Sequence, residues 1–568
     1  MCFGDPVKSK FKYLTSAFLL LSTSVIVKII GAVYKIPLTS FIGAVGRGYF
    51  AAAYNLYLPL HAIIMGAFPI ALSRLTSKYN ACQDRRMLSS LIKGGRSVFF
   101  FTGTAGMIVL LIAAKPYSEF IASSPKSIYT VLVLAPSLLF SCLASTYRGY
   151  FEGFMNMVPT SVSQTIEAVF KLVFGLLFAK LSMAYLYQDF AADHIIFHTV
   201  LQSDEEALSF IYPFTSASAM LGVSLGSAIS YLYLWIYYRI HRDKTLPLVS
   251  GKEGRNELLQ FSLPIVTSCA VQSVFQFLDT ASIQYALGSI NTQTLKNVYG
   301  QFIALAGVTE NDITTYVYGL FSTSLDFKNL IPGITMALGV CVVPAICREY
   351  EYGSREKLTS LMNNIYKYTC LLSLFLGLYL ALCSREVLQF FYGGSSQDIV
   401  DSCDSLVKYF SVSAPIYSLA STAVFCVQAV GKPEKSIMPY VVSGAVRVIL
   451  NLLLVRNEML ILFGAVISGA AGYLILFVMN ARIAAKVSGA KFDLMNGLIK
   501  PIFIGGISFI LSRFLFSSFF VTNFVFVNLL IKFIVFSIIF CMLCFLLKVL
   551  NFREVFFMFQ SKKNGLNT

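Results

Sequence analysis

Charged residues are scarce in this chain. Asp, Glu, Lys and Arg together make up 13% of its 568 residues, and 57% of the residues are hydrophobic. Soluble globular proteins carry about 25% charged residues, so this composition excludes an ordinary soluble domain. Helices satisfy all of their backbone hydrogen bonds internally, which a segment crossing a bilayer must do. The sequence therefore predicts an all-α integral membrane protein.

Histidine is nearly absent, with four residues in the chain. His194 and His198 are spaced as on one face of a helix, beside Asp193, but two histidines are too few for a closed zinc site. His61 has no carboxylate at helical spacing, which is typical of an interior histidine without a proton-relay role. The sequence also lacks a glycine-rich phosphate loop and a nucleophile elbow. We therefore predict no metal site, no catalytic residues and no cofactor, and the chain is not expected to be an enzyme.

A framework of paired cysteines is missing too. The twelve cysteines are spread through apolar segments, where a free Cys behaves as a small hydrophobic residue. Cys541 and Cys544 form a CxxC motif within a run of Phe, Ile and Leu. A metal or redox site needs accessible thiolates and further ligands. We interpret this motif as helix packing.

Long apolar stretches are abundant. They predict about fourteen membrane-spanning helices, near residues 14–43, 47–73, 97–114, 128–147, 160–185, 212–238, 258–288, 313–346, 367–384, 405–430, 437–456, 460–481, 499–520 and 523–549. The first stretch has no small-residue cleavage site after it, so it is expected to remain as a helix.

The basic residues follow the loops between these spans. The net charge is +16, and with the N-terminus inside, most of the 44 Lys and Arg fall in cytoplasmic segments. The positive-inside rule then predicts a multi-pass protein of the plasma membrane with both termini in the cytoplasm. Because topology explains the basic surplus, no nucleic-acid partner is expected.

Several charged residues lie inside the predicted spans. A charge at the bilayer centre costs about 2.5 to 3.5 kcal/mol, so it usually faces a partner or a watery cavity. We predict that these residues line a substrate cavity: Lys28, Lys35, Glu167, Lys171, Asp279, Asp326, Lys328 and Arg447.

The spacing of these charges suggests which of them act together. Glu167 and Lys171 lie one turn apart, so they share one face of an otherwise apolar helix. They either neutralise each other at a helix contact or form a working pair in the cavity. Lys28 and Lys35, seven residues apart, also share a face. Asp326 and Lys328, two residues apart, do not.

A polar stretch precedes Glu167. Its cation, glycines and proline predict a tight hinge loop, followed by a helix that Thr160 or Ser161 caps. The hinge residues are Arg148, Gly149, Gly153 and Pro159.

This stretch also resembles a known family. The pattern Arg-Gly-Tyr-Phe-x-Gly at 148–153, then Pro159-Thr160, Glu167 and Lys171, is similar to the stage V sporulation protein B family of oligosaccharide and polysaccharide exporters. Gly31-Ala-Val-Tyr-Lys-Ile-Pro-Leu-Thr39 and Gln428-Ala-Val-Gly-Lys-Pro433 are similar as well. That family lies in the multidrug/oligosaccharidyl-lipid/polysaccharide (MOP) flippase superfamily, related to the lipid II flippases. The resemblance implies a MATE-like or lipid II flippase-like fold, in which the basic residues of the first helix face a central cavity.

The two halves of the chain mirror each other. Lys171 and Arg447 are 276 residues apart, and Pro69 and Pro344 are 275 apart. Two anchors at nearly one offset predict an internal duplication into two pseudo-symmetric lobes of six spans each, related by an axis along the membrane normal. The predicted parts are an N-terminal lobe at 1–240, a cytoplasmic linker at 241–257, a C-terminal lobe at 258–486, and two extra helices with a cytoplasmic tail at 487–568.

Positive charges outnumber negative ones in the predicted cavity, which favours an anionic ligand such as a pyrophosphate-linked headgroup. The resemblance implies a flippase that moves a lipid-linked oligosaccharide or peptidoglycan precursor from the inner to the outer leaflet by alternating access. Its expected partners are this substrate and the bilayer, with cell-wall synthesis proteins as candidates; a coupling ion or the membrane potential would drive it. One alternative is a cation-coupled multidrug antiporter of the same superfamily, which would favour carboxylates in its cavity. Another is a membrane-embedded glycan polymerase, which would cluster catalytic carboxylates.

Overall fold

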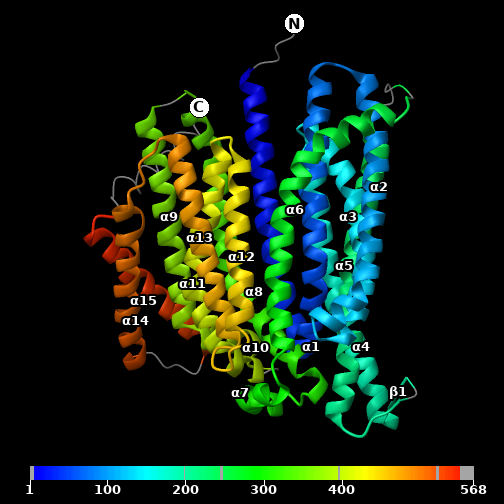
Figure 1. The fold of residues 1–568 in the computed structure, drawn as a ribbon, viewed down its shortest axis with the longest axis vertical. Helices are drawn as coiled ribbons and strands as arrows, with labels where there is room; N and C mark the ends of the chain where they lie inside the picture. The colour runs from blue at the N-terminus through cyan, green and yellow to red at the C-terminus, as the bar shows by residue number, and fades with distance from the viewer. Residues whose placement is uncertain are drawn as a thin grey trace. The chain divides into compact units, whose positions relative to one another are not determined.

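The computed structural model describes residues 6–197, 199–242, 247, 249–352, 354–394, 397–519 and 524–549. Within these ranges the long elements are all α-helices (Figure 1), and the single sheet is a two-stranded antiparallel hairpin that pairs Ile195 with Val200. The predicted all-α membrane protein is confirmed.

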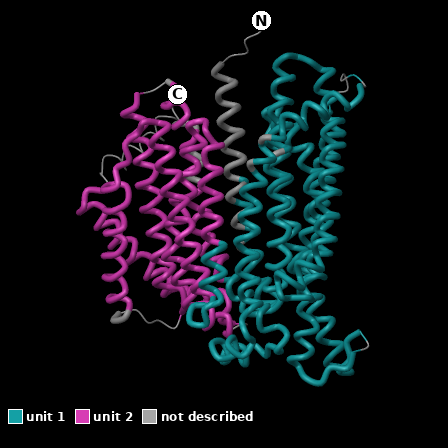
Figure 2. The backbone as a smooth tube through the Cα atoms, in the orientation of Figure 1, with its two compact units in different colours: residues 1–323, 448–461 teal, residues 324–447, 462–568 magenta. Residues whose placement is uncertain are grey.

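The chain forms two compact units (Figure 2). Unit 1 comprises Met1–Thr323 and Val448–Ile461, and unit 2 comprises Ser324–Arg447 and Leu462–Thr568. The functional lobes at 1–240 and 258–486, with their linker and C-terminal helix pair, remain a prediction.

Unit 1 is built from the first helices of the chain. They are α1 (Pro6–Ala81), α2 (Arg85–Pro116), the short turns η1 (Tyr117–Ile121) and η2 (Pro125–Ser127), α3 (Ile128–Gly153), α4 (Val158–Asp193), the hairpin β1 (Ile195–Ile196) and β2 (Thr199–Val200), α5 (Asp204–His241), α6 (Lys252–Gly288), α7 (Thr292–Leu305) and η3 (Glu310–Asp312). The beginning of α8 (Ile313–Tyr352), up to Thr323, also belongs to unit 1.

Unit 2 holds the rest of α8 and most of the later helices. These are α9 (Arg355–Leu382), α10 (Ser384–Tyr392), α11 (Gln397–Ala429), η4 (Pro433–Ser436), α12 (Ile437–Leu454), α13 (Leu462–Ser488), η5 (Met495–Ile499), α14 (Lys500–Phe519) and α15 (Val525–Leu546). Helix α12 crosses the boundary, because its residues from Val448 on group with unit 1.

Helix α1 contains a sharp break at Gly43, where φ is 62°. An L-residue with a side chain is strained in this left-handed region, so a glycine is favoured there. The break falls where the predicted spans 14–43 and 47–73 meet. Among the described residues, eleven helices are long and apolar enough to cross a membrane, or twelve if the two parts of α6, bent by 44°, form one span. The predicted count of fourteen is not confirmed.

The predicted hinge is mostly helical. Helix α3 continues through Arg148 and Gly149 and ends at Gly153, six residues beyond the predicted span. Helix α4 begins at Val158, with Pro159 in its first turn and no side-chain cap. The predicted capping by Thr160 or Ser161 is therefore wrong, since the helix has already begun before them. The connection shrinks to residues 154–157.

The two glycines of this stretch serve packing. A Cβ atom at Gly149 would lie 2.8 Å from the carbonyl oxygen of Pro69, and one at Gly153 would lie 2.5 Å from the Cβ of Thr76. Both glycines therefore allow α3 to approach the backbone of α1 closely, as small residues one turn apart do at membrane helix contacts. This contact fixes the end of α3 that carries Arg148.

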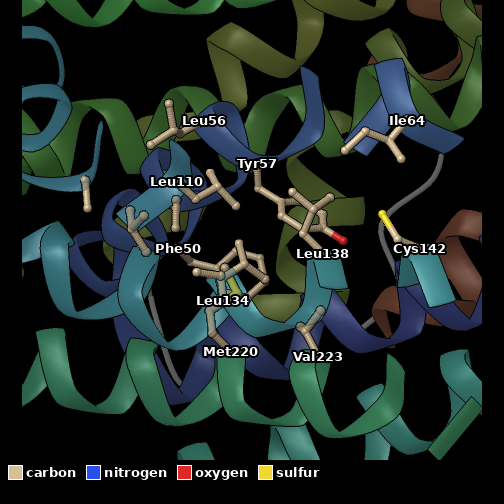
Figure 3. Packing of buried hydrophobic residues seen from close by; sticks show 14 of the residues in the cluster. Phe50, Leu56, Tyr57, Ile64, Leu110, Leu134, Leu138, Cys142, Met220 and Val223 are labelled. Carbon is tan, nitrogen blue, oxygen red and sulfur yellow. The ribbon is translucent and has the colours of Figure 1, made fainter. Parts of the chain in front are cut away.

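A hydrophobic core joins α1, α2, α3 and α5 within unit 1. Figure 3 shows residues of all four helices meeting there, and its labelled members include Phe50 and Tyr57 from α1, Leu134 from α3 and Met220 from α5. Tight packing of these side chains holds the polar residues of α3 and α4 in fixed positions relative to α1.

Helices α4 and α5 are longer than a membrane requires. Helix α4 has 36 residues and α5 has 38, so each is about 55 Å long, against a hydrocarbon thickness of about 30 Å. Their far ends and the β1–β2 hairpin share a small core of their own, built from Leu186, Phe190, Ile196, Leu201, Ala207 and Ile211. The stretch around the hairpin is thus an ordered extension of two long helices. His194 ends α4 in a left-handed conformation, and His198 lies outside the described residues.

Candidate functional site

An ion pair between α3 and α4 forms the centre of the polar residues in unit 1. Arg148 Nη2 lies 2.9 Å from Glu167 Oε2, with side chains 9% and 28% exposed. The guanidinium also donates to the hydroxyls of Ser163 and Ser230, at 3.0 and 2.9 Å. Ser227 of α5 donates to the other carboxylate oxygen at 3.3 Å. The pair therefore ties α3, α4 and α5 together.

Lys171 has a different neighbour from the one predicted. Its ammonium donates to the hydroxyl of Tyr54 at 2.6 Å and lies near the rings of Tyr54 and Tyr34, at 4.9 and 5.4 Å from their centroids. Glu167 forms its ion pair with Arg148 instead, and the expectation that Glu167 and Lys171 act together in the cavity stays a prediction. Arg148, 19 residues before Glu167 in the chain, takes the place that spacing along the helix assigned to Lys171.

Two other predicted residues of unit 1 lie on α1. The side chain of Lys28 is outside the described residues, and that of Lys35 is half-buried. Thr39, one turn later, donates its hydroxyl to the carbonyl of Lys35 at 2.9 Å. The predicted pairing of Lys28 and Lys35 on one face stays a prediction.

Asp279 of α6 meets the part of α12 that belongs to unit 1. The side-chain amide of Asn451 donates to Asp279 Oδ1 at 3.0 Å and to the Asp279 carbonyl at 3.2 Å. It also reaches the Ser282 hydroxyl at 3.0 Å. A single asparagine thus orients the Asp279 carboxylate, which sequence spacing could not indicate because the two residues are 172 positions apart.

In unit 2, two cations share one aromatic group. Lys328 is 8% exposed and Arg447 is 7% exposed. The Lys328 ammonium lies 5.3 Å from the ring centroid of Tyr473, and the Arg447 guanidinium lies 4.8 Å from the same centroid. The Tyr417 ring lies 4.2 Å from that of Tyr473 and also faces Lys328.

Gly472 leaves the space for the Arg447 side chain. A Cβ atom there would lie 2.1 Å from Arg447 Cγ. Asp326, two residues before Lys328, is half-buried on the same helix. The structure thus brings Lys328 and Arg447 beside one ring, although 119 positions separate them in the sequence.

Sequence reasoning missed a buried carboxylate, Asp312. It is 3% exposed and accepts hydrogen bonds from Tyr49 at 2.5 Å, from Thr309 at 3.1 Å and from Ser209. Lys126 lies 3.5 Å away. The residue directly precedes an apolar stretch, where an acidic residue is typical of a solvated loop, so the sequence carries no signal of these partners.

Two glycines mark a very close approach of α1 and α8 beside this cluster. A Cβ atom at Gly48 would lie 2.1 Å from the carbonyl oxygen of Thr315, and one at Gly319 would lie 1.8 Å from that of Ala44. The two backbones are therefore in contact at this end of unit 1. Nothing passes between α1 and α8 here unless these contacts and those of Asp312 break.

The described residues hold no group of three or more His, Cys, Asp or Glu that could bind a metal ion. The described structure is that of a helical membrane protein whose buried charges are held by arginine, tyrosine and serine side chains.

The fold is similar to those of two solved membrane proteins. A structure of a multidrug resistance MATE family transporter of the MOP superfamily, in an inward-facing conformation, superimposes with a TM-score of 0.60 at 15% identity, covering 82% of this chain and 98% of the other. A lipid II flippase MurJ structure, inward closed, gives a TM-score of 0.64 at 14% identity, covering 94% and 99%.

Comparison of sequences adds named relatives. The chain is 23% identical to the lipid II flippase MurJ of Bacillus subtilis over 502 residues, 85% of this chain and 84% of the relative. It is 20% identical to stage V sporulation protein B of the same organism over 492 residues, 84% and 85% of the two chains. Residues 13–192 match the family described as polysaccharide biosynthesis protein. The resemblance predicted from the motifs is confirmed.

Proposed function

We propose that this protein is a flippase that moves a pyrophosphate-linked lipid saccharide, an oligosaccharide or a peptidoglycan precursor, from the inner to the outer leaflet. The likeness to the lipid II flippase, which extends over more than four fifths of both chains, supports the proposal, as does the shared fold. The relatives carry the names of transporters, which supports the prediction that the chain is not an enzyme.

The observation that carries the proposal is the position of Lys328 and Arg447 beside Tyr473. An aromatic face stabilises a cation and leaves its charge in place. Two buried cations beside one ring therefore offer two positive charges to one anion. A pyrophosphate offers several oxygens for charge-assisted hydrogen bonds, and Arg447 offers a planar fork for them.

The other cavity residues predicted from the sequence stay a prediction: Lys28, Lys35 and Lys171 would add positive charge, and Glu167, Asp279 and Asp326 would offer acceptors to sugar hydroxyls.

The contacts of Asp312 give the proposed cycle a defined step. Asp312, Tyr49 and the glycines of α1 and α8 lie at the end of unit 1 opposite to Lys78 and Lys252, which the basic loops assign to the cytoplasm. In the proposed alternating-access cycle, these contacts within unit 1 would belong to a gate on the outer side. Release of substrate to the outer leaflet requires the Tyr49–Asp312 hydrogen bond to break.

The transport proposal is tested with purified protein in liposomes that contain a defined lipid-linked saccharide. We expect Arg447→Ala to lower the flipping rate strongly and Arg447→Lys to lower it in part, because lysine keeps the charge without the fork. Arg385→Ala is the matched control, since Arg385 is 58% exposed and pairs with Asp401. Parental rates for Lys28→Ala, Lys35→Ala and Arg447→Ala would refute the cationic site. Transport of cationic drugs without lipid flipping would favour the antiporter.

The proposed orientation has a native reporter. Cys82 is exposed between α1 and α2, at the end that carries Lys78. A membrane-impermeant maleimide should label Cys82 in inside-out vesicles and leave it unlabelled in intact cells, with Cys82→Ser as the control. Glu205→Cys, in the first turn of α5, should show the opposite pattern. Labelling of Cys82 in intact cells would reverse the proposed topology.

A further inference from the structure

Arg96 of α2 lies between two tyrosine rings from two other helices. Its guanidinium is 4.7 Å from the ring centroid of Tyr238 on α5 and 5.3 Å from that of Tyr147 on α3. Both rings are buried. The tyrosines hold the cation in place through cation–π contacts, but their hydroxyls and rings leave its positive charge uncompensated.

Arg96 also has an unsatisfied hydrogen-bonding group. Its Nε atom is buried and has no acceptor, and no described carboxylate forms an ion pair with it. A buried donor without an acceptor is unfavourable, because its lost hydrogen bonds to water are not replaced. The cation is therefore prepared for an anionic acceptor that the protein itself does not provide.

The surroundings of Arg96 are those of a membrane interface. Trp235 and Tyr237 of α5 pack against the cluster that contains Tyr147 and Tyr238, and such aromatic belts mark the level of the lipid headgroups. Arg239, which is exposed, places its guanidinium 4.4 Å from the Trp235 ring. This end of α5 leads into the basic segment assigned to the cytoplasm.

The neighbourhood also offers an apolar surface for acyl chains. Phe100, one turn after Arg96 on α2, is 48% exposed, and Ile236 on α5 is 44% exposed. A free phosphate ion would gain nothing from these side chains, whereas a phospholipid places its phosphate and its acyl chains on adjacent levels. Basic pockets between membrane helices on the cytoplasmic side suit anionic headgroups.

We propose that Arg96, Tyr147, Tyr238, Trp235 and Arg239, here called the Arg96 site, bind the phosphate of an anionic phospholipid of the inner leaflet. The guanidinium of Arg96 donates to the phosphate oxygens, the tyrosine rings hold that guanidinium in position, and Arg239 adds a second positive charge at the headgroup level. The site lies on α2, α3 and α5, apart from the cavity residues of the proposed transport function.

The chain contains a single tryptophan, which makes the site its own reporter. Full-length protein is reconstituted in phosphatidylcholine vesicles that contain a small fraction of phosphatidylglycerol brominated on its acyl chains, or the same fraction of brominated phosphatidylcholine. Bromine quenches tryptophan fluorescence at short range. We expect the brominated phosphatidylglycerol to quench Trp235 more strongly at equal mole fraction, which measures a preference for the anionic lipid.

Variants assign this preference to the site. Arg96→Gln should lower it about fivefold, the factor that corresponds to about 1 kcal/mol for each basic residue near the surface. Arg96→Lys should lower it less, since it keeps the charge and loses the fork. The double variant Arg96→Gln with Arg239→Gln should abolish it. Lys115→Gln, at the other end of α2 and 72% exposed, should leave it unchanged.

Several results would overturn the proposal. They are equal quenching by both lipids in the parental protein, an unchanged preference in Arg96→Gln, or loss of the whole preference in Arg239→Gln alone. Soluble glycerol phosphate that relieves the quenching would assign the site to free phosphate instead. Where Arg96→Gln does not fold, Arg96→Lys and the parental protein still decide the outcome.

Discussion

The Arg148–Glu167 ion pair offers the sharpest prediction about the structure. Arg148→Ala removes the ion pair and the hydrogen bonds to Ser163 and Ser230, and it leaves the Glu167 carboxylate without its cation. Breaking one partner of a buried pair costs about 3 to 5 kcal/mol. Glu167 is 28% exposed, so solvent compensates part of the loss. We expect a destabilisation of about 3 kcal/mol, at the lower end of that range.

Native cysteines provide the assay. Cys142 lies on α3, less than two turns from Arg148, and is buried. A dye that becomes fluorescent on reaction with thiols reports when this core opens during heating of the purified protein in detergent. Arg148→Ala, Glu167→Gln and the double variant form a double-mutant cycle. We expect the double variant to be more stable than the sum of the single losses predicts, by about 1 to 3 kcal/mol.

Charge exchange separates the two pairings of Glu167. Arg148→Glu combined with Glu167→Arg should recover folded protein better than either change alone. Glu167→Lys combined with Lys171→Glu should not recover it, because Lys171 donates to Tyr54 and Arg148 would face a new cation. Additive effects in the cycle, or recovery in the second exchange alone, would refute the assignment of Arg148 as the partner.

Three further predictions follow from single residues. Gly153→Ala should destabilise the protein by about 1 to 3 kcal/mol through overpacking against Thr76. Gly469→Ala on α13, where a Cβ atom has open space, should not destabilise it. Thermal unfolding compares the two variants, and equal stability would contradict the close contact at Gly153. Gly472→Ala should lower flipping as much as Arg447→Ala does, because its Cβ atom takes the place of Arg447 Cγ; a parental rate at matched protein level would show that Arg447 has no fixed position. Hydrogen bonds from the side chain and backbone of Asn496 hold the pKa of Asp493 below its usual range. The stabilising contribution of Asp493 is therefore present above the unfolded pKa of about 3.9 and is lost as the pH falls through the lower folded pKa. Asp493→Asn should weaken this loss of thermal stability at acid pH, and an unchanged pH profile would refute the prediction.

The positions of the membrane helices were largely predictable from the sequence. Apolar stretches mark helices whose backbone must satisfy itself in a bilayer, and the break at Gly43 falls between two predicted spans. The end of α3 was not predictable, since Arg148 and the two glycines read as a loop. Glu167 compensates the charge of Arg148 inside the helix, and the glycines let α3 approach α1 closely; neither contact can be inferred from the local sequence.

The candidate site was predictable in its residues and not in its contacts. The rarity of charges inside spans pointed to Glu167, Lys171, Lys328 and Arg447 without knowledge of the fold. Which of them meet depends on pairs far apart in sequence, such as Lys328 and Arg447 beside Tyr473. Spacing along α4 favoured Lys171 as the partner of Glu167, whereas in the structure Arg148 of α3 forms the ion pair. Asp312 lies outside the spans predicted from the sequence, so its charge did not mark it as a candidate.

The unbroken length of α4 has a mechanical consequence. Glu167 and Lys171 lie near one end of a rod that continues to Asp193 and is braced there by α5 and the β1–β2 hairpin. A tilt of about 5° about Glu167 would move the tip of the helix, about 39 Å away, by about 3 Å. The tip of the extension therefore moves farther than the residues around the buried ion pair. A fluorophore attached near this tip would make small tilts of α4 measurable as changes in distance by energy transfer.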